Sequence, residues 1–237
     1  YLLLDHYRRP GWLYQFKIQI RRDGSASPVD FEKLWHTVRV VLFNQFFGTL
    51  PVLLLVFPLM VWRGMDPAQV APPWFEVLWH LAVMLLVEEI LFYVVHRALH
   101  HKYLYARIHK VHHEYKESIA ITTHYVHYLE HIFGNLMPIF AGALIVGAHP
   151  LTILAWIGLA VTNALHSHSG YNFPWQAWSV HHDYHHFRIR GNYGVLGLLD
   201  WLLATDGPMR QVHARYVAER EQDSCEGVGG ELRETRS

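Results

Sequence analysis

The stretch HRALHHKYLYARIHKVHH, residues 96–113, determines how the rest of the chain is interpreted. It contains an HxxxH motif at 96–100 and an HxxHH motif at 109–113, and a second HxxHH motif follows at 182–186. Side chains three and four residues apart on a helix lie on one face, so each motif is expected to direct two or three imidazole groups to a common point. Because neutral imidazole binds iron, zinc, copper and nickel, the motifs predict a metal site.

The number of histidines predicts two ions rather than one. The candidate ligands in the three motifs are His96, His100, His109, His112, His113, His182, His185 and His186. One ion rarely takes more than about six ligands, and a catalytic zinc needs only about three from the protein. Two ions with roughly four or five nitrogens each fit the count better. Scattered surface histidines are the alternative, which explains three such motifs poorly.

Four apolar segments predict helices that cross a membrane. The segments are residues 38–62, 74–95, 129–146 and 151–165. About twenty apolar residues span a hydrocarbon core, and we expect the two shorter segments to cross as well. Pro51 and Pro58 are expected to kink the first helix, as membrane helices tolerate. Glu88 and Glu89 lie near the end of the second segment, where a charge is usually functional unless it is already close to water.

The distribution of basic residues predicts the orientation in the membrane. Lys and Arg are concentrated in the N-terminal lead-in, in residues 97–116 and after residue 188, whereas the loops at 63–73 and 147–150 contain few. The positive-inside rule then places both termini and the histidine motifs in the cytosol. The predicted fold is an all-α integral membrane protein, with two transmembrane helical hairpins and a cytosolic His-rich helical cap that holds a di-metal centre.

The same patterns predict three regions. We expect a cytosolic or interfacial lead-in at 1–34, a membrane-embedded domain at 35–210 and a flexible tail at 211–237. The chain begins with Tyr1 rather than Met, so a preceding segment could be missing.

Composition supports metal chemistry in a membrane and argues against other classes. The chain has 237 residues, of which 51% are hydrophobic and 17% charged, against about 25% charged in soluble domains. Its 20 histidines equal Lys and Arg combined, and the formal net charge is +0. Without a broad basic stripe, no nucleic-acid partner is expected. The single cysteine, Cys225, excludes an internal disulfide framework.

Other polar residues near the motifs are weaker candidates. Ligating histidines usually donate their second nitrogen to a carboxylate or a carbonyl, and nearby carboxylates could accept it or be solvated surface acids: Glu89, Glu130, Asp183 and Asp200. Further histidines could ligate or simply pack: His124, His127, His131, His166, His168 and His181. The Lys and Arg residues between the motifs could bind an acidic lipid headgroup, which does not explain the histidine spacing.

Several stretches resemble the fatty acid hydroxylase/sterol desaturase superfamily. They are EEILFYVVHRALHH at 88–101, IHKVHHE at 108–114, HSGY at 168–171, HHDYHH at 181–186 and NYG at 192–194. The closing D…ATD pattern at 200–206 resembles the family's D…GTD, with Ala204 in place of Gly. Tyr128 also replaces a proline that the family often has after the second motif. Within the superfamily, HSGY and HHDYHH are most similar to the C4-methylsterol oxidases.

The resemblance implies a function and completes the candidate ligand set. Members are integral endoplasmic-reticulum proteins with a di-iron centre. They use O2, and electrons from NAD(P)H relayed by cytochrome b5 or a reductase, to oxidise unactivated C–H bonds of lipids. The metal ligands of these proteins are clustered histidines. The resemblance therefore implies that the eight histidines of the three motifs are ligands, and it adds His127 and His168. No catalytic residue beyond the ligands is expected.

The resemblance leaves the substrate open. We expect oxidation of a 4-methylsterol or related sterol, with a fatty acyl or sphingoid chain as the alternative substrate. A non-catalytic membrane regulator that keeps the fold is a hypothesis from another class. A zinc-dependent hydrolase or a metal carrier is disfavoured mainly by the number of ligands.

Overall fold

The computed structural model describes residues 7, 11–18, 30–66, 68, 70–174 and 179–206, and in these residues the chain is helical. The only β pairing among them is an isolated bridge between Lys17, which follows the short helix α2 (Gly11–Tyr14), and Tyr171. Four helical stretches are long and apolar enough to cross a membrane: Phe31–Trp62, Trp74–Leu99, Tyr128–Val146 and Pro150–Ser167. The four predicted segments are thereby confirmed as long apolar helices. The expected flexible tail and most of the lead-in lie outside the described residues.

The first long stretch joins α3 (Phe31–Phe43), the π-helical turn η1 (Asn44–Thr49) and α4 (Leu50–Trp62). It begins at Asp30, whose carboxylate accepts the backbone N–H groups of Glu32 and Lys33 and so caps the helix. Pro51, one of the two expected kink positions, lies in the first turn of α4, directly after the wider π turn. Proline lacks an N–H group and crowds the preceding turn, and a π turn accommodates both effects.

The other long helices follow in order, with one more π turn before a proline. α5 (Trp74–Leu99) is the longest single helix. The short α7 (Tyr128–Glu130) leads into the π turn η4 (His131–Leu136) and then α8 (Met137–Val146), which has Pro138 in its first turn. α9 (Pro150–Ser167) completes the set.

The main helix contact joins α5 to α8, which are not neighbours in the sequence. Gly142 of α8 makes this contact possible, because a Cβ at that position would lie 2.7 Å from the Met84 Cα of α5. The apolar core forms around this contact, from Met84, Phe140 and Trp156 among others, and α4 packs on the outer side of α8. The close partner of the second long helix is therefore α8, rather than α4 as in a tight sequential hairpin.

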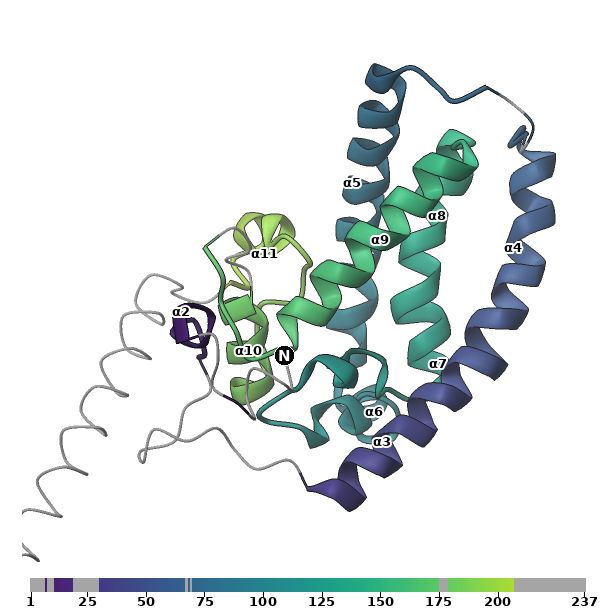
Figure 1. Cartoon of the computed structure of the whole chain (residues 1–237). Coiled ribbons are helices and arrows are strands. Elements are labelled where there is room, and N and C mark those ends of the chain that lie inside the picture. Colours follow the sequence, from purple (N-terminus) through teal and green to yellow (C-terminus); the bar gives the residue numbers. More distant parts are fainter. Residues whose placement is uncertain are drawn as a thin grey trace, which may run out of the picture.

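Figure 1 shows that the connections α4–α5 and α8–α9 lie together at one end of the helices, while the histidine-bearing segments lie toward the other end. Those segments are short: α6 (Lys102–Arg107), the 3₁₀ helices η2 (His109–Glu114) and η3 (Ala120–His124), α10 (Ser179–Arg188) and α11 (Leu198–Leu202). They form a helical cap over the ends of α5 and α9. The predicted His-rich helical cap is thus present, and its cytosolic side stays a prediction.

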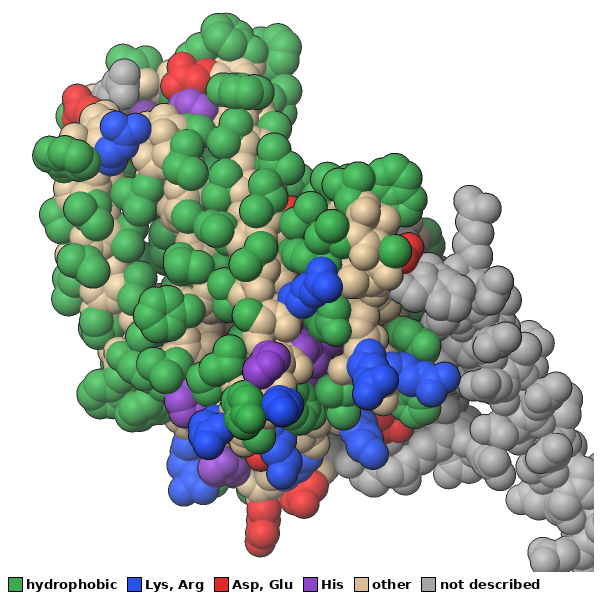
Figure 2. Space-filling view, turned by 180° about the vertical axis from the view of Figure 1, so that it is seen from behind, with side chains coloured by type: hydrophobic (Ala, Val, Ile, Leu, Met, Phe, Trp, Pro, Cys, Tyr) green, Lys and Arg blue, Asp and Glu red, His purple; other side chains and the backbone are tan. Residues whose placement is uncertain are grey.

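The surface of the long helices is apolar, as a lipid environment requires. In Figure 2 hydrophobic side chains cover this face, and most Lys and Arg side chains gather at the capped end. Leu54, Phe57 and Leu154 are exposed on the helices. Trp62, Trp74 and Trp79 are exposed near the α4–α5 connection, the position of an interfacial aromatic belt. The chain therefore has the surface of a multi-pass membrane protein.

Candidate metal centre

Nine of the ten histidines predicted as ligands gather into two adjacent groups. Within each group one ring nitrogen per residue lies within 4.8 Å of all the others. The first group has five members: His96, His100, His109, His113 and His185. The second has four: His112, His168, His182 and His186. The sizes of the groups agree with the expected four or five nitrogens for each of two ions, and ligation itself stays a prediction.

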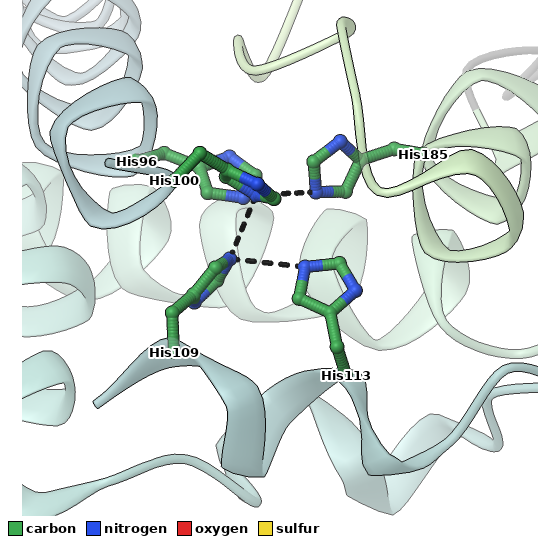
Figure 3. A group of neighbouring side chains, drawn as sticks. All are labelled: His96, His100, His109, His113 and His185. Atoms are coloured by element: carbon green, nitrogen blue, oxygen red, sulfur yellow. Dashed lines mark hydrogen bonds between the residues drawn. The ribbon is translucent and has the colours of Figure 1, made fainter. Parts of the chain in front are cut away.

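The five-histidine group draws its side chains from three elements around a central point (Figure 3). The Nε2 atom of His100, at the end of α5, lies 3.1 Å from Nε2 of His185 in α10 and 3.0 Å from Nε2 of His109 in η2. The Nε2 atom of His113 lies 3.0 Å from that of His109. His96 Nε2 is buried and has no hydrogen-bond partner among the described residues.

The four-histidine group is built in the same way where α9 ends. His168 follows the last residue of α9, and its Nε2 atom lies 3.2 Å from Nε2 of His112 and 2.9 Å from that of His182. The Nε2 atom of His186 lies 3.1 Å from that of His182.

Each HxxHH motif directs two of its histidines to one group, as expected, and the third to the other group. In η2 the rings of His109 and His112 stack with centroids 5.5 Å apart, yet they belong to different groups. In α10 the rings of His182 and His185 stack at 5.7 Å and are divided in the same way. Since stacked rings are parallel but displaced, a pair three residues apart serves two adjacent sites rather than one.

The Nδ1 partners show which nitrogen of these rings is free to bind a metal. His96 Nδ1 lies 2.8 Å from the Tyr193 carbonyl oxygen, and His185 Nδ1 lies 2.6 Å from that of Gly191. A carbonyl can only accept a hydrogen bond, so each Nδ1 carries the proton and each Nε2 presents a lone pair to the group. Such partners are typical of metal-binding histidines.

The second group has equivalent partners on other segments. His168 Nδ1 donates to the Ala164 carbonyl oxygen at 2.9 Å, and His186 Nδ1 donates to that of Tyr115 at 3.1 Å. Their Nε2 atoms therefore carry lone pairs directed at the neighbouring Nε2 atom of His182. A cation between the rings would accept several such lone pairs, which is the arrangement expected of a metal site.

The number of nitrogens in each group bears on the kind of metal that the residues fit. A tetrahedral zinc takes about four ligands, and a catalytic zinc only about three from the protein. The five-histidine group exceeds that number, so it fits a metal of higher coordination number better than tetrahedral zinc.

Burial keeps these imidazoles neutral at physiological pH. It lowers the pKa of His100 to about 3, with neighbouring His96 adding to the effect, and it lowers the pKa of His168 to about 4. Burial also lowers the pKa of the other cap histidines in the two groups: His109, His112, His113, His182, His185 and His186. Neutral rings are the form that binds metal.

The four predicted carboxylates have different roles. Glu130 Oε1 lies 2.7 Å from Nδ1 of His109, the direct contact expected of a metal-site carboxylate. Glu89 and Asp200 instead accept backbone N–H groups of the segment that supplies Tyr193. Asp183 is buried in α10. None of the four is a solvated surface acid, and Glu88 is buried as well.

The remaining candidates lie outside both groups. His127, predicted through the resemblance, caps α7, and its Nδ1 accepts the Leu129 N–H at 3.2 Å. His131 is buried, with its Nε2 2.8 Å from the Thr49 hydroxyl. His166 stacks on Phe173. His124 and His181 line the pocket described next, without belonging to either group.

A pocket extends from the histidine groups into the space between α5, α8 and α9. It has an empty volume of about 1100 Å³ including its open mouth. Its apolar lining includes Phe92, Leu99, Ile139, Ala160 and Val161, and five histidines of the two groups line it as well. Ala160 lies eight residues before His168 on α9, which at about 1.5 Å per residue gives a depth of about 12 Å.

One carboxyl group lies at the far end of this pocket. Glu88 is 7% exposed and lines the pocket eight residues before His96 on α5, again about 12 Å away along the helix. Its carboxyl group makes no hydrogen bond within the part of the chain that the structure describes.

Sequence reasoning missed the backbone acceptors of the site. The carbonyl groups of Tyr115, Gly191 and Tyr193 have no side-chain signature, although the NYG stretch at 192–194 was singled out for its resemblance. It also missed the pocket, since Phe92, Ile139 and Ala160 come from three helices whose packing the sequence does not reveal.

Comparison with known proteins agrees with this site. The model of the family described as fatty acid hydroxylase matches residues 81–205, which include all nine grouped histidines. The chain belongs to the fatty acid hydroxylase family. The match covers most of α5, the cap and the Asp200 segment, and it confirms the resemblance that the motifs indicated. No solved structure matches the chain.

Individual members of the fatty acid hydroxylase family are similar over most of the chain. Fatty acid hydroxylase domain-containing protein 2 of Macaca fascicularis is 39% identical over 90% of this chain and 63% of its own length. Methylsterol monooxygenase 2-2 of Arabidopsis thaliana is 32% identical over 86% of this chain and 79% of its own length. Very-long-chain aldehyde decarbonylase GL1-8 of Oryza sativa subsp. indica is 32% identical over 90% of this chain and 82% of its own length. The chain thus spans less than two thirds of the first of these relatives.

Proposed function

We propose that this chain is a membrane-bound, non-haem di-iron oxygenase that oxidises a C–H bond of a lipid with O2. The observation that carries the proposal is the pair of histidine groups, whose ring nitrogens converge beside an apolar pocket. Family membership supports iron as the metal, which imidazole ligands alone do not select.

In this proposal the protein's own residues hold the metal, shield the site from water and orient the lipid. When bound, two iron ions would supply the oxidising power for activation of O2. His96, His109 and their partners fix the ring orientations through Nδ1 contacts. Phe92 and Ile139 in the pocket wall exclude water from the reacting carbon. The apolar pocket would orient the lipid so that one carbon lies beside the two histidine groups.

A sterol, in particular a 4-methylsterol, is our first substrate class. The relative named methylsterol monooxygenase and the resemblance of HSGY and HHDYHH to C4-methylsterol oxidases support it. An acyl or sphingoid chain is the second class, supported by the relative named very-long-chain aldehyde decarbonylase. Both classes suit a pocket with apolar walls.

We propose that the capped end faces the cytosol in the endoplasmic-reticulum membrane. Lys102, Arg107 and Lys110 are exposed at this end, and positive charge favours the cytosolic side. The endoplasmic reticulum is proposed from the family. So is the electron supply, from NAD(P)H through cytochrome b5 or a reductase.

A turnover assay with labelled oxygen tests the proposal. Iron-loaded protein in lipid nanodiscs would be given ¹⁸O2, a reductase system and either a 4-methylsterol or a long-chain acyl lipid. We expect one ¹⁸O atom in the product of one class and none with His113→Ala. Bound iron without turnover of either class would contradict the oxygenase and favour the regulator hypothesis.

A further inference from the structure

Glu89 is a carboxylate buried in the apolar helix α5. Its hydrogen-bond partners are backbone N–H groups. It is fully buried, and its Oε2 atom accepts the N–H groups of Val195 at 2.8 Å and Leu196 at 2.7 Å. Its Oε1 atom accepts the N–H of Leu199 at 3.1 Å. Charge-assisted bonds of this kind are stronger than neutral ones, so Glu89 ties residues 195–199 to α5.

Asp200 ties the preceding part of the same segment. Its carboxylate accepts the N–H of Tyr193 at 2.9 Å, the N–H of Gly194 at 2.6 Å and the hydroxyl of Thr205 at 2.7 Å. A Cβ on Gly194 would lie 2.7 Å from Glu89 Oε1 and 3.0 Å from Asp200 Oδ2. Glycine is therefore required where the two carboxylates approach the backbone. We call residues 191–200 with these two carboxylates the clamped loop.

The clamped loop contacts only one of the two histidine groups through its carbonyls. Gly191 and Tyr193 supply the acceptors for Nδ1 of His185 and His96, both in the five-histidine group. In the four-histidine group, the Nδ1 acceptors that the structure shows come from Ala164 and Tyr115, outside the loop. Both groups take histidines from η2 and α10. The carbonyl groups that accept their Nδ1 protons nevertheless come from different segments.

We propose that Glu89 and Asp200 are positioning residues that set the metal affinity of the five-histidine group alone. This rests on the proposed metal ligation. By fixing the carbonyls of Gly191 and Tyr193, the clamp holds His185 and His96 in one orientation, with the proton on Nδ1 and the lone pair on Nε2. Loss of such an outer partner lowers metal affinity about 10–100-fold. One metal position can thus be weakened while the other stays intact.

Cobalt(II) titration of chains with only one intact group tests this inference. His168→Ala with His182→Ala leaves only the five-histidine group intact, and His113→Ala with His185→Ala leaves only the four-histidine group intact. Glu89→Gln is placed in each background, because Gln has the same shape but lacks one acceptor oxygen and the charge. Binding is followed by the cobalt absorption spectrum of the full chain in detergent. We expect about 10–100-fold weaker cobalt binding where the five-histidine group is intact and unchanged binding where the four-histidine group is intact.

Two further variants separate positioning from general damage. Glu88→Gln is the matched control, since Glu88 is the adjacent buried carboxyl on α5 and contacts no N–H of the loop. It should leave cobalt binding unchanged in both backgrounds. Gly194→Ala keeps both carboxylates but separates them from the loop, and it should reproduce the selective loss.

The possible outcomes distinguish this inference from the proposed function. Equal weakening of both groups by Glu89→Gln, or no weakening of either, would overturn the inference and leave the proposed function standing. A wild-type chain that binds neither cobalt nor iron would overturn both. Weaker cobalt binding by the five-histidine group alone, in Glu89→Gln and Gly194→Ala but not in Glu88→Gln, would support the inference that the clamped loop positions His96 and His185.

Discussion

Replacing Gly142 with alanine tests the packing that positions the first histidines. Gly142 of α8 faces Met84 of α5, and an added Cβ would lie 2.7 Å from Met84 Cα, 3.1 Å from its Cγ and 3.2 Å from its Cβ. Carbon atoms prefer separations of about 3.5–4.0 Å. The Met84 Cα belongs to the backbone, so it cannot move aside as a side chain would. The two helices must therefore separate by about 1 Å.

The expected loss of stability follows from this separation. Overpacking typically costs about 1–3 kcal/mol, and a gap of about 1 Å forfeits up to about half of the dispersion energy of the neighbouring contacts. We expect Gly142→Ala to lower the free energy of unfolding by about 2–3 kcal/mol. For a chain of this length that corresponds to a fall of about 4–12 °C in Tm.

Thermal unfolding in detergent, followed by circular dichroism, measures this effect. Gly158→Ala on α9 is the matched control, because no atom lies within 4 Å of a Cβ at that position. It should leave Tm unchanged or raise it, since alanine favours helix by about 1 kcal/mol over glycine. If both variants behaved alike, or if Gly142→Ala were stabilising, the α5–α8 contact described here would be refuted.

Three other predictions follow from single contacts. Glu130→Leu removes the Nδ1 partner of His109, and cobalt titration should show about 10–100-fold weaker binding at the five-histidine group; unchanged binding would contradict the contact. The pKa values of His100 and His168 lie below their unfolded value of about 6.5, so the unfolded chain binds more protons below that pH. Stability of the metal-free protein should therefore fall from pH 6.5 toward pH 4, by up to about 1.4 kcal/mol per unit for each histidine, and a Tm that is flat or rises over this range would argue against it. Glu88 lines the far end of the pocket, where its carboxyl group could form a hydrogen bond with a hydroxyl group of the lipid. Glu88→Leu should therefore lower kcat/KM for a hydroxylated lipid by up to about 10-fold, relative to kcat/KM for the same lipid without its hydroxyl. If the ratio of these two kcat/KM values stayed unchanged, contact between Glu88 and the lipid hydroxyl would be excluded.

The elements and most of the site could be predicted from the sequence. Runs of about twenty apolar residues indicate long helices whatever their partners are, and all four were found. The HxxxH and HxxHH spacings identified His96, His113 and their companions as candidate ligands, because spacing on a helix fixes which side chains share a face. Ligand number then predicted two groups rather than one.

The sequence could not show how the pieces meet. The division of His109 and His112 between groups depends on where η2 lies relative to α10, which is a tertiary property. The pairing of α5 with α8 depends on one close approach at Gly142. The role of Glu89 was foreseen only as a possible histidine partner, because its real partners are backbone N–H groups without a side-chain signature.

The metal content of the purified chain tests the central claim most directly. The protein, produced under iron-replete conditions in detergent or nanodiscs, would be analysed by elemental analysis together with Mössbauer spectroscopy. The account predicts two iron ions per chain, in nitrogen-rich sites, with one ion lost in His185→Ala and the other in His112→Ala. A single tetrahedral zinc, or no bound metal in the folded chain, would contradict it.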